Sequence, residues 1–234
     1  MTYELVLAAR NVGKMEALAA DLRQRFSVPI MVIGADLETP DGASRLHAEI
    51  KQRGLVLDAL VNNAGYGGFG EFKDTALANE LAMMQLNMGA VVVLTKLFLP
   101  DLLVKRGKIL NTASTAAFQP GPYMAVYYAT KAFVLSFSEA LAAELEGSGV
   151  SVTALCPGPT ASGFQDKADL QASALVKGKK LPSARSVAAV GYRAMQRGQR
   201  VVIPGAANWI MAQSVRFTPR RLVTALVKSM SRPV

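Results

Sequence analysis

Short apolar runs alternate with longer amphipathic segments along most of the chain. Apolar runs of about four to eight residues, bounded by polar or turn residues, are typical of buried strands. They occur at Tyr3–Ala9, Pro29–Ile33, Leu55–Val61, Lys108–Thr112, Val150–Cys156 and Val201–Pro204. Between them, apolar residues recur at helical spacing, which predicts helices at Met15–Phe26, Gly42–Arg53, Asn79–Val104, Tyr127–Gly147 and Ser183–Arg197. This alternation favours right-handed crossovers, so we expect an α/β fold with a doubly wound, mostly parallel sheet.

No repeat or linker divides the chain, so we expect one domain over residues 1–207. Residues 208–234 form a basic, amphipathic C-terminal extension, in which apolar residues from Trp209 to Val227 alternate with arginines and lysines. Such a tail can cap the fold, pair with another subunit, or lie on a membrane surface. Capping or pairing is preferred, because a short helical tail on an α/β domain usually packs on protein.

Charge is distributed very unevenly. The chain of 234 residues has 26 Lys/Arg and 17 Asp/Glu, a formal net charge of +9. Residues 1–166 carry 13 basic and 16 acidic side chains, whereas residues 167–234 carry 13 basic ones and a single acid, Asp169. A basic C-terminal third is compatible with an acidic partner, but a solvated helical face is the simpler interpretation. We therefore expect no nucleic-acid partner.

Composition excludes several classes of protein. The single cysteine, Cys156, excludes an internal disulfide framework, and the single histidine, His47, lies in a polar predicted helix and is expected at the surface. No metal site is expected. No apolar run reaches the roughly 18–20 residues of a membrane span, and Met1–Leu7 lacks the basic flank of a secretory signal. A cytoplasmic location follows as an expectation.

The residues that suggest chemistry are Ser114, Tyr127 and Lys131. Tyr127 and Lys131 are four residues apart in a predicted helix, so they share one face. A phenol with a pKa near ~10 is a poor acid–base catalyst, and we expect the neighbouring ammonium to lower that pKa. Ser114 follows the strand Lys108–Thr112, at the edge where parallel sheets bind ligands. The three residues predict proton transfer to or from the oxygen of a carbonyl or alcohol.

Two other tyrosines lie near Lys131. Tyr123 precedes the helix in a loop containing Pro120, Gly121 and Pro122, and Tyr128 is three residues from Lys131. Only Tyr127 combines the four-residue spacing with a position thirteen residues after Ser114, so it is the preferred acid–base residue.

Together these motifs resemble the short-chain dehydrogenase/reductase family. Asn62-Asn63-Ala64-Gly65 follows a predicted strand, Asn87 lies in the helix Asn79–Val104, and Pro157-Gly158 follows the sixth strand. The resemblance extends from about Tyr3 to Phe164. It implies a Rossmann-like fold and an NAD(P)-dependent oxidoreductase in which hydride transfer interconverts a carbonyl and an alcohol, with Tyr127 as acid and base.

The resemblance also assigns roles to residues. It implies that Ser114 steadies the substrate oxygen, Lys131 tunes Tyr127 and binds the ribose, and Asn87 holds a water for the proton relay. The cofactor-binding residues that it implies are Arg10, Asp36, Leu37, Asn63, Ala64, Gly65, Tyr127, Lys131, Pro157, Gly158 and Thr160. Arg10 closes a strand where an arginine accommodates a 2′-phosphate, so NADPH is expected over NADH, with NAD still possible. A homodimer or homotetramer is expected by analogy, through Asn79–Val104 and Tyr127–Gly147.

One part of the family pattern is not found. The first strand and its Gly-rich turn, which hold the cofactor pyrophosphate, would precede the strand that ends at Arg10. The loop Gly65–Gly70 has the spacing G-x-G-x-x-G, but no apolar-faced helix follows directly, so we interpret it as a flexible loop near the substrate. Three accounts remain open: a longer natural chain, a sheet with altered pairing, or a strand from another subunit. The alternative function is a truncated or cofactor-deficient homologue that binds partners without turnover.

The substrate is expected to be apolar. Phe118, Met124, Phe164 and Trp209 are candidates for the wall of its pocket. Ser162 and Thr160 both lie near the position where the family often has a threonine for the carboxamide. Gln165–Pro182 is polar and weakly periodic, as expected of a mobile lid.

Overall fold

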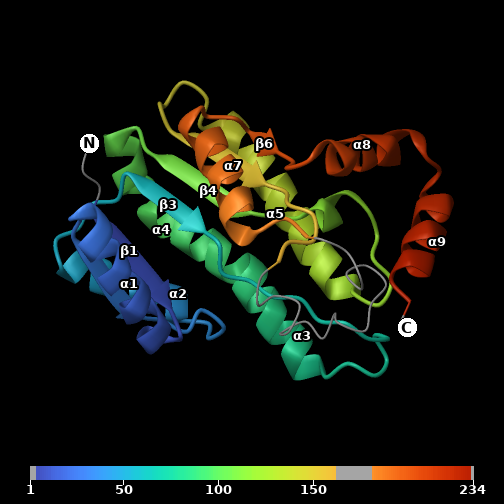
Figure 1. Ribbon diagram of the computed structural model, residues 1–234, viewed down its shortest axis with the longest axis horizontal. Coiled ribbons are helices and arrows are strands. Elements are labelled where there is room, and N and C mark those ends of the chain that lie inside the picture. Colours follow the sequence, from blue (N-terminus) through green and yellow to red (C-terminus); the bar gives the residue numbers. More distant parts are fainter. Residues whose placement is uncertain (1–3, 162–180, 233–234) are drawn as a thin grey trace.

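The computed structural model describes residues 4–161 and 181–232 and consists of two parallel β-sheets flanked by helices (Figure 1). The smaller sheet pairs two strands, β1 (Leu5–Ala9) and β2 (Ile30–Gly34). The larger has four strands in the order of the chain: β3 (Ala59–Asn62), β4 (Lys108–Thr112), β5 (Ser151–Leu155) and β6 (Val201–Val202). Every described pairing is parallel, with Leu5 opposite Ile30 and Ala59 opposite Lys108. The predicted parallel α/β fold is confirmed.

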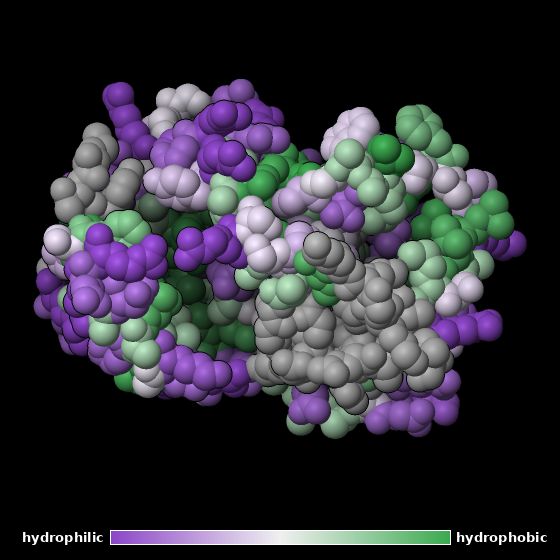
Figure 2. Space-filling view, viewed as in Figure 1, coloured by the Kyte–Doolittle hydropathy of each residue, from purple (hydrophilic) through white to green (hydrophobic). Residues whose placement is uncertain are grey.

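The sheet is divided between β1 and β3. These two strands share no ladder, and Val61 on β3 is 53% exposed. In a continuous parallel sheet, whose two faces are both covered, this side chain would be buried. Figure 2 shows a hollow with apolar residues at its floor between the part formed by α1, β1 and β2 and the rest of the molecule. The division lies where the family resemblance expects one more strand, and the two sheets do not close it by altered pairing.

Helices cover both sheets, with bounds close to the predicted ones. They are α1 (Val12–Phe26), α2 (Gly42–Gln52), α3 (Leu77–Met84), α4 (Ala90–Lys105), α5 (Ala125–Glu144), α7 (Ala184–Gln196), α8 (Ala206–Ser214) and α9 (Arg220–Met230). Helix α1 begins where the Asn11 side chain accepts a 2.9 Å hydrogen bond from the Lys14 amide, and it ends at Ser27 in a left-handed conformation.

The main core joins the two sheets through the contact between α2 and α4. Leu46 and Ile50 of α2 and Phe98 of α4 are buried in one apolar cluster, which also includes Ile33 of β2 and Ile109 of β4. The ring of His47 packs edge-on against Phe98, with 4.8 Å between ring centroids. This cluster holds the β1–β2 sheet against the larger one without any ladder between them.

The long helix predicted over Asn79–Val104 is present, but it is interrupted by a π-helical turn. Helix α3 leads through Gln85–Gly89 into α4, giving a continuous helical stretch from Leu77 to Lys105. Among the described residues, this stretch alone is long and apolar enough to cross a membrane by length and composition. Leu94, Phe98 and Leu102 along it are buried in the main core, so it is a core helix of this fold.

The C-terminal residues fold back onto the domain. Val223 and Val227 of α9 are buried in a second cluster with Met83, Tyr127 and Tyr128. Figure 1 shows α8 and α9, in red, at the right-hand end of the molecule, beyond β6. The tail therefore caps the fold, as its sequence predicts, and reaches the residues expected to be catalytic.

Candidate active site

Ser114 and Tyr127 face each other at the carboxyl end of β4. Ser114 begins a short 3-10 turn, where its Oγ accepts a 3.1 Å hydrogen bond from the Ala116 amide. Tyr127 lies in the first turn of α5, and its hydroxyl is hydrogen-bonded to the Ser114 side chain. Burial raises the pKa of Tyr127 to about 12, although the bond to Ser114 opposes this shift. The phenol is therefore protonated at neutral pH and is able to donate.

Lys131 lies one turn further along α5, and its ammonium is buried. Its Nζ donates a 2.7 Å hydrogen bond to the Thr112 carbonyl and lies 5.9 Å from the centroid of the Tyr127 ring. Burial lowers the pKa of Lys131 to about 8. The expectation of a lowered pKa for Tyr127 is wrong: burial dominates and the pKa of the phenol is raised, while the Lys131 ammonium donates to the Thr112 carbonyl.

The other two tyrosines are placed differently. Tyr123 has a positive φ of 67° and precedes α5. The ring of Tyr128 lies against Gly121, where an added Cβ would be 2.2 Å from its Cγ, and the Ser231 side chain interacts with its hydroxyl. Neither takes the place of Tyr127 beside Ser114, in agreement with the choice made from spacing.

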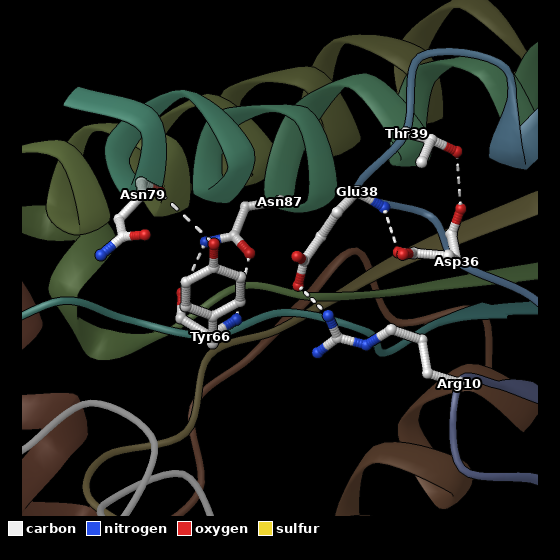
Figure 3. A network of polar contacts seen from close by, with 7 residues as sticks. All are labelled: Arg10, Asp36, Glu38, Thr39, Tyr66, Asn79 and Asn87. Carbon is white, nitrogen blue, oxygen red and sulfur yellow. Dashed lines mark hydrogen bonds and ion pairs between the residues drawn. The ribbon is translucent and has the colours of Figure 1, made fainter. Parts of the chain in front are cut away.

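Asn87 lies in the π-helical turn and connects three segments (Figure 3). Its Oδ1 accepts from the Tyr66 amide at 3.2 Å, and its Nδ2 donates to the Tyr66 carbonyl at 2.9 Å and to the Thr130 hydroxyl at 3.0 Å. The side chain thus clamps the loop after β3 to α5. A π-helical turn displaces a side chain from the usual helical register, and such turns are common at functional sites.

A buried polar network below the site was not predicted from the sequence. Asn62 donates to Asn111 at 2.9 Å and to Thr95 at 3.1 Å, and Asn111 donates to Ser138 at 2.9 Å. The sequence feature that could have indicated this network is Asn111, an asparagine within the apolar strand β4, because a buried amide requires polar partners. The network ties the ends of β3 and β4 to α4 and α5, which fixes the floor of the site.

One large cavity of 1490 Å³ unites most of the predicted site residues, and its walls are mostly apolar. The predicted residues that line it are Ser114, Tyr127, Lys131, Asn63, Gly65, Pro157, Gly158, Thr160 and Met124. Two predicted wall residues do not line it: Phe118 packs beside the cluster of Val134 and Ala154, and Trp209 is 54% exposed. Phe164, Ser162 and most of Gln165–Pro182 lie outside the described residues.

The residues expected at the adenosine end form a separate group at the ends of β1 and β2 (Figure 3). Arg10 pairs with Glu38, with 2.7 Å between Nη1 and Oε1. The Asp36 carboxylate accepts a 3.0 Å bond from the Glu38 amide, and the Leu37 side chain is buried in the main core. None of these residues lines the cavity. The Arg10–Glu38 pair was not anticipated, because the sequence gives no sign that the chain turns back at Glu38.

Comparison with known proteins assigns the family. A profile of the short chain dehydrogenase family matches residues 1–172. The chain belongs to the short-chain dehydrogenase family. It is 33% identical over 157 residues to serine 3-dehydrogenase of Agrobacterium fabrum, a match that covers 67% of this chain and 61% of that protein. It is 34% identical over 155 residues to 11-beta-hydroxysteroid dehydrogenase 1A of Arabidopsis thaliana, with 66% and 44% covered. The chain thus spans about half the length of these short-chain dehydrogenases.

Solved structures of short-chain dehydrogenases have the same fold. The enzyme from Sphingobium yanoikuyae in complex with NADPH superposes with a TM-score of 0.80 at 28% identity, covering 92% of this chain and 84% of that one. A bulky-bulky ketone specific alcohol dehydrogenase from Comamonas testosteroni gives a TM-score of 0.76 at 27% identity, covering 92% and 82%. The chain therefore has the architecture of this family as well as its sequence.

The short-chain dehydrogenase site fits one half of a nicotinamide dinucleotide. Gly65 packs against the catalytic side chains: a Cβ there would be 2.9 Å from Asn87 Oδ1 and 3.4 Å from Lys131 Nζ. Lys131, Pro157, Gly158 and Thr160 share its cavity, which suits the nicotinamide and its ribose. Arg10 and Asp36 suit the adenosine end. Among residues 4–161 and 181–232, no Gly-rich turn between these two groups leads into a helix N-terminus that would hold the pyrophosphate.

Contacts with Tyr123 hold the loop Gly65–Gly70 in place. The Gly70 amide donates a 2.9 Å bond to the Tyr123 carbonyl, and the rings of Phe69 and Tyr123 are 6.2 Å apart. The loop therefore lies against the segment that precedes α5. Its interpretation as a flexible loop near the substrate stays a prediction.

Proposed function

We propose that the chain is an NADP-dependent oxidoreductase that interconverts a bulky, apolar ketone and the corresponding alcohol. The observation that carries this proposal is the hydrogen-bonded pair of Ser114 and Tyr127, with Lys131 one turn away, at the base of a large apolar cavity. This arrangement supports the proposal because it combines a proton donor with a second hydroxyl able to bind a substrate oxygen.

The side chains have distinct roles. Ser114 donates a hydrogen bond to the substrate oxygen, and Tyr127, a neutral phenol, gives its proton to that oxygen as the carbonyl becomes an alcohol. The hydride for the carbonyl carbon would come from a bound nicotinamide cofactor, and in the reverse direction the cofactor would accept a hydride from the alcohol while Tyr127 takes back the proton. Burial disfavours the phenolate that remains on Tyr127 after proton transfer to the substrate. The Lys131 ammonium stabilises that phenolate.

The cavity supports a large apolar substrate. Its volume of 1490 Å³ exceeds the roughly 300–1,000 Å³ of a typical ligand site, which leaves room for both the nicotinamide and the substrate. Apolar side chains of α7 and α9 contribute to its walls, among them Val187, Met195, Leu222 and Val227. Two relatives have names of the same kind, a bulky-bulky ketone alcohol dehydrogenase and an 11-beta-hydroxysteroid dehydrogenase.

The test is NADPH-dependent reduction of a panel of cyclic and long-chain ketones by the purified chain. Tyr127→Phe should lower kcat by about 10²–10⁴-fold, because only the proton donor is removed. Tyr128→Phe is the matched control and should keep activity within about threefold, since Tyr128 faces Gly121 and Ser231. Equal loss of activity in both variants would contradict the role of Tyr127.

The second candidate is a protein that binds partners without turnover. It is favoured by the division of the sheet between β1 and β3, which share no ladder among the described residues. Titration with NADPH, followed by the fluorescence of the nicotinamide, separates the two candidates. Saturable binding supports the oxidoreductase, whereas absence of binding and of turnover favours the binding protein.

We also propose that the chain forms a homodimer or homotetramer through α4 and α5. Phe133 on α5 is 39% exposed and stacks with Phe137, with ring centroids 5.9 Å apart, and Val92 on α4 is 37% exposed. Exposed aromatic pairs of this kind are common at subunit interfaces. Phe133→Asp should convert the oligomer to monomer in analytical ultracentrifugation, and an unchanged sedimentation coefficient would exclude this face.

A further inference from the structure

Asn208 of α8 lies against the Pro157-Gly158 segment that follows β5. Helix α8 begins a few residues after β6 (Figure 1), and Asn208 lines the same cavity as Tyr127 and Lys131. A Cβ added to Gly158 would be 2.7 Å from Nδ2, 2.7 Å from Oδ1 and 3.0 Å from Cγ of Asn208. Both polar atoms are nearer than Cγ, so the polar edge of the amide is turned toward Gly158.

The loop before α8 fixes the orientation of the Asn208 amide. Its Nδ2 donates a 2.7 Å hydrogen bond to the Pro204 carbonyl. Gly205, with a φ of 91°, lies close to the same nitrogen, since a Cβ there would be 3.4 Å from Nδ2. Only the NH2 group of an amide can donate, so Oδ1 is the atom left to accept a hydrogen bond from a ligand. No described residue donates to Oδ1.

Among the described residues, three side-chain amides line the cavity, those of Asn63, Gln119 and Asn208. The Oδ1 of Asn63 accepts a 3.3 Å hydrogen bond from the Thr112 hydroxyl. The three atoms nearest to a Cβ on Gly158 all belong to Asn208. Asn208 is therefore the amide that adjoins the Pro157-Gly158 segment and still has an acceptor to offer.

We infer that Asn208 Oδ1 accepts a hydrogen bond from the carboxamide NH2 of a bound nicotinamide and so sets the orientation of that ring. This inference rests on the proposed function. A primary carboxamide has two N–H donors, and Pro157 and Gly158 line the part of the cavity that suits the nicotinamide. The Thr160 hydroxyl nearby donates a 2.9 Å hydrogen bond to the Gly158 carbonyl, so its proton is not directed to a ligand.

A fixed acceptor in a mostly apolar cavity discriminates between ligands. A ligand that places an N–H or O–H against Oδ1 gains a hydrogen bond, whereas one that places a methyl group there leaves the acceptor unpaired and away from water. A hydroxyl on the substrate would use the same acceptor as the carboxamide of the cofactor. Titration with the nucleotide alone separates these two sources of the donor.

Isothermal titration calorimetry of the purified chain, without substrate, with NADP⁺ and with its acetylpyridine analogue tests the contact. The analogue has a methyl ketone in place of the carboxamide, so it keeps the carbonyl and loses the N–H donors. The wild type should bind NADP⁺ about tenfold more tightly than the analogue. Asn208→Leu should weaken NADP⁺ binding about tenfold and change binding of the analogue by less than about threefold. The ratio of the two dissociation constants then falls to about one.

Two further variants separate a ligand contact from a purely structural role of Asn208. Asn208→Asp keeps an acceptor but cannot donate to the Pro204 carbonyl, so both affinities can change while their ratio stays within about threefold of the wild-type ratio. Gln119→Leu removes another amide from the same cavity and should keep the wild-type ratio. Because both titrations use the same variant, partial unfolding cancels in the ratio.

Several results would overturn the contact. A wild-type ratio near one, or equal weakening of both nucleotides in Asn208→Leu, would refute it and leave the proposed function intact. Loss of the ratio in Gln119→Leu alone would assign the contact to the other amide. Unchanged nucleotide binding in Asn208→Leu, with a raised KM only for ketones that carry a hydroxyl, would show that the acceptor serves the substrate. Absence of binding for both nucleotides would refute the proposed function and this contact together.

Discussion

Lys131 closes the end of β4 by donating from Nζ to the main-chain carbonyl of Thr112 at 2.7 Å. The same ammonium is 5.9 Å from the Tyr127 ring centroid and is buried, so its charge is held by a single carbonyl dipole and by the nearby phenol. A charge in such a position destabilises the folded state, which is the physical reason for the lowered pKa of Lys131. The role proposed for Lys131 beside Tyr127 would account for this cost.

The pH dependence of stability should reveal this buried charge. The pKa of Lys131 is about 8 in the folded protein and 10.5 in the unfolded chain. Between these values the unfolded chain binds more protons, so the contribution of Lys131 to the free energy of unfolding rises with pH. Tyr127 acts oppositely above pH 10, because its pKa of about 12 makes the unfolded chain release its proton first.

Lys131→Met removes the contribution of the buried Lys131 ammonium to the free energy of unfolding. It should raise the free energy of unfolding at pH 7 by about 2 kcal/mol, less than the full pKa shift implies because the bond to Thr112 is lost as well. The gain in the free energy of unfolding should become smaller toward pH 10, as measured by urea denaturation at several pH values. The Lys131→Met variant should also reduce ketones more slowly than the wild type. A gain that is constant between pH 7 and 10 would contradict the lowered pKa of Lys131.

The sequence was sufficient to predict local relationships between residues and the order of the helices and strands. The four-residue spacing of Tyr127 and Lys131 and the position of Ser114 after a strand determined the site, because helix period and strand end are local properties. The direction of the Tyr127 pKa shift was not predictable, since it depends on burial by α9 and the loops around it. The positions of Phe118 and Trp209 were misjudged for the same reason.

Features that depend on longer-range contacts were also not predictable from the sequence. The π-helical turn at Asn87 arises where the loop after β3 meets α5, and helical periodicity alone does not reveal that meeting. The ion pair of Arg10 and Glu38 joins the ends of two strands through a turn whose direction depends on tertiary packing. The division of the sheet was foreseen only as one of several outcomes, because pairing between β1 and β3 is a matter of geometry.

Cofactor preference should depend on the balance between Arg10 and Glu38. The Arg10 side chain is 49% and the Glu38 side chain 21% exposed, and the two are 2.7 Å apart, so a 2′-phosphate must compete with the carboxylate for the guanidinium. Glu38→Gln should tighten NADPH binding up to about fivefold, which is the strength of an exposed ion pair. Arg10→Gln should weaken NADPH binding by about 10–100-fold and leave NADH nearly unchanged. Fluorescence titration with both nucleotides is the measurement, and a parallel loss for NADPH and NADH in Arg10→Gln would argue against 2′-phosphate recognition.

Removal of the Asn87 side chain should destabilise the site more than removal of a neighbouring asparagine. Asn87→Ala removes the hydrogen bonds of Asn87 to the Tyr66 amide, the Tyr66 carbonyl and the Thr130 hydroxyl, which we expect to cost about 3 kcal/mol in the free energy of unfolding. Asn79→Ala is the control, since Asn79 is exposed and only its main-chain carbonyl accepts from Tyr66. It should change stability by less than about 0.5 kcal/mol in urea denaturation. Similar losses in both variants would show that Asn87 is not a clamp.

Gly65 is the point where the loop after β3 approaches the catalytic side chains most closely. A Cβ at this position would be 2.9 Å from Asn87 Oδ1 and 3.4 Å from Lys131 Nζ, so the clamp and the ammonium would both have to move. Gly65→Ala should therefore lower the free energy of unfolding by about 2 kcal/mol. It should also reduce kcat for ketone reduction by about 10²-fold, because a displacement of about 1 Å at Lys131 misplaces the catalytic groups.

The matched control for Gly65→Ala is Gly13→Ala in α1. An added Cβ at Gly13 meets only Asn11 Oδ1 at an ordinary 3.7 Å, and the position is helical. This variant should be neutral or more stable by up to about 1 kcal/mol. Thermal unfolding and kcat of the two variants separate crowding at the site from a general effect of adding a methyl group. Wild-type kcat in Gly65→Ala would show that the loop and Lys131 move independently, and that the close approach at Gly65 does not position the catalytic lysine.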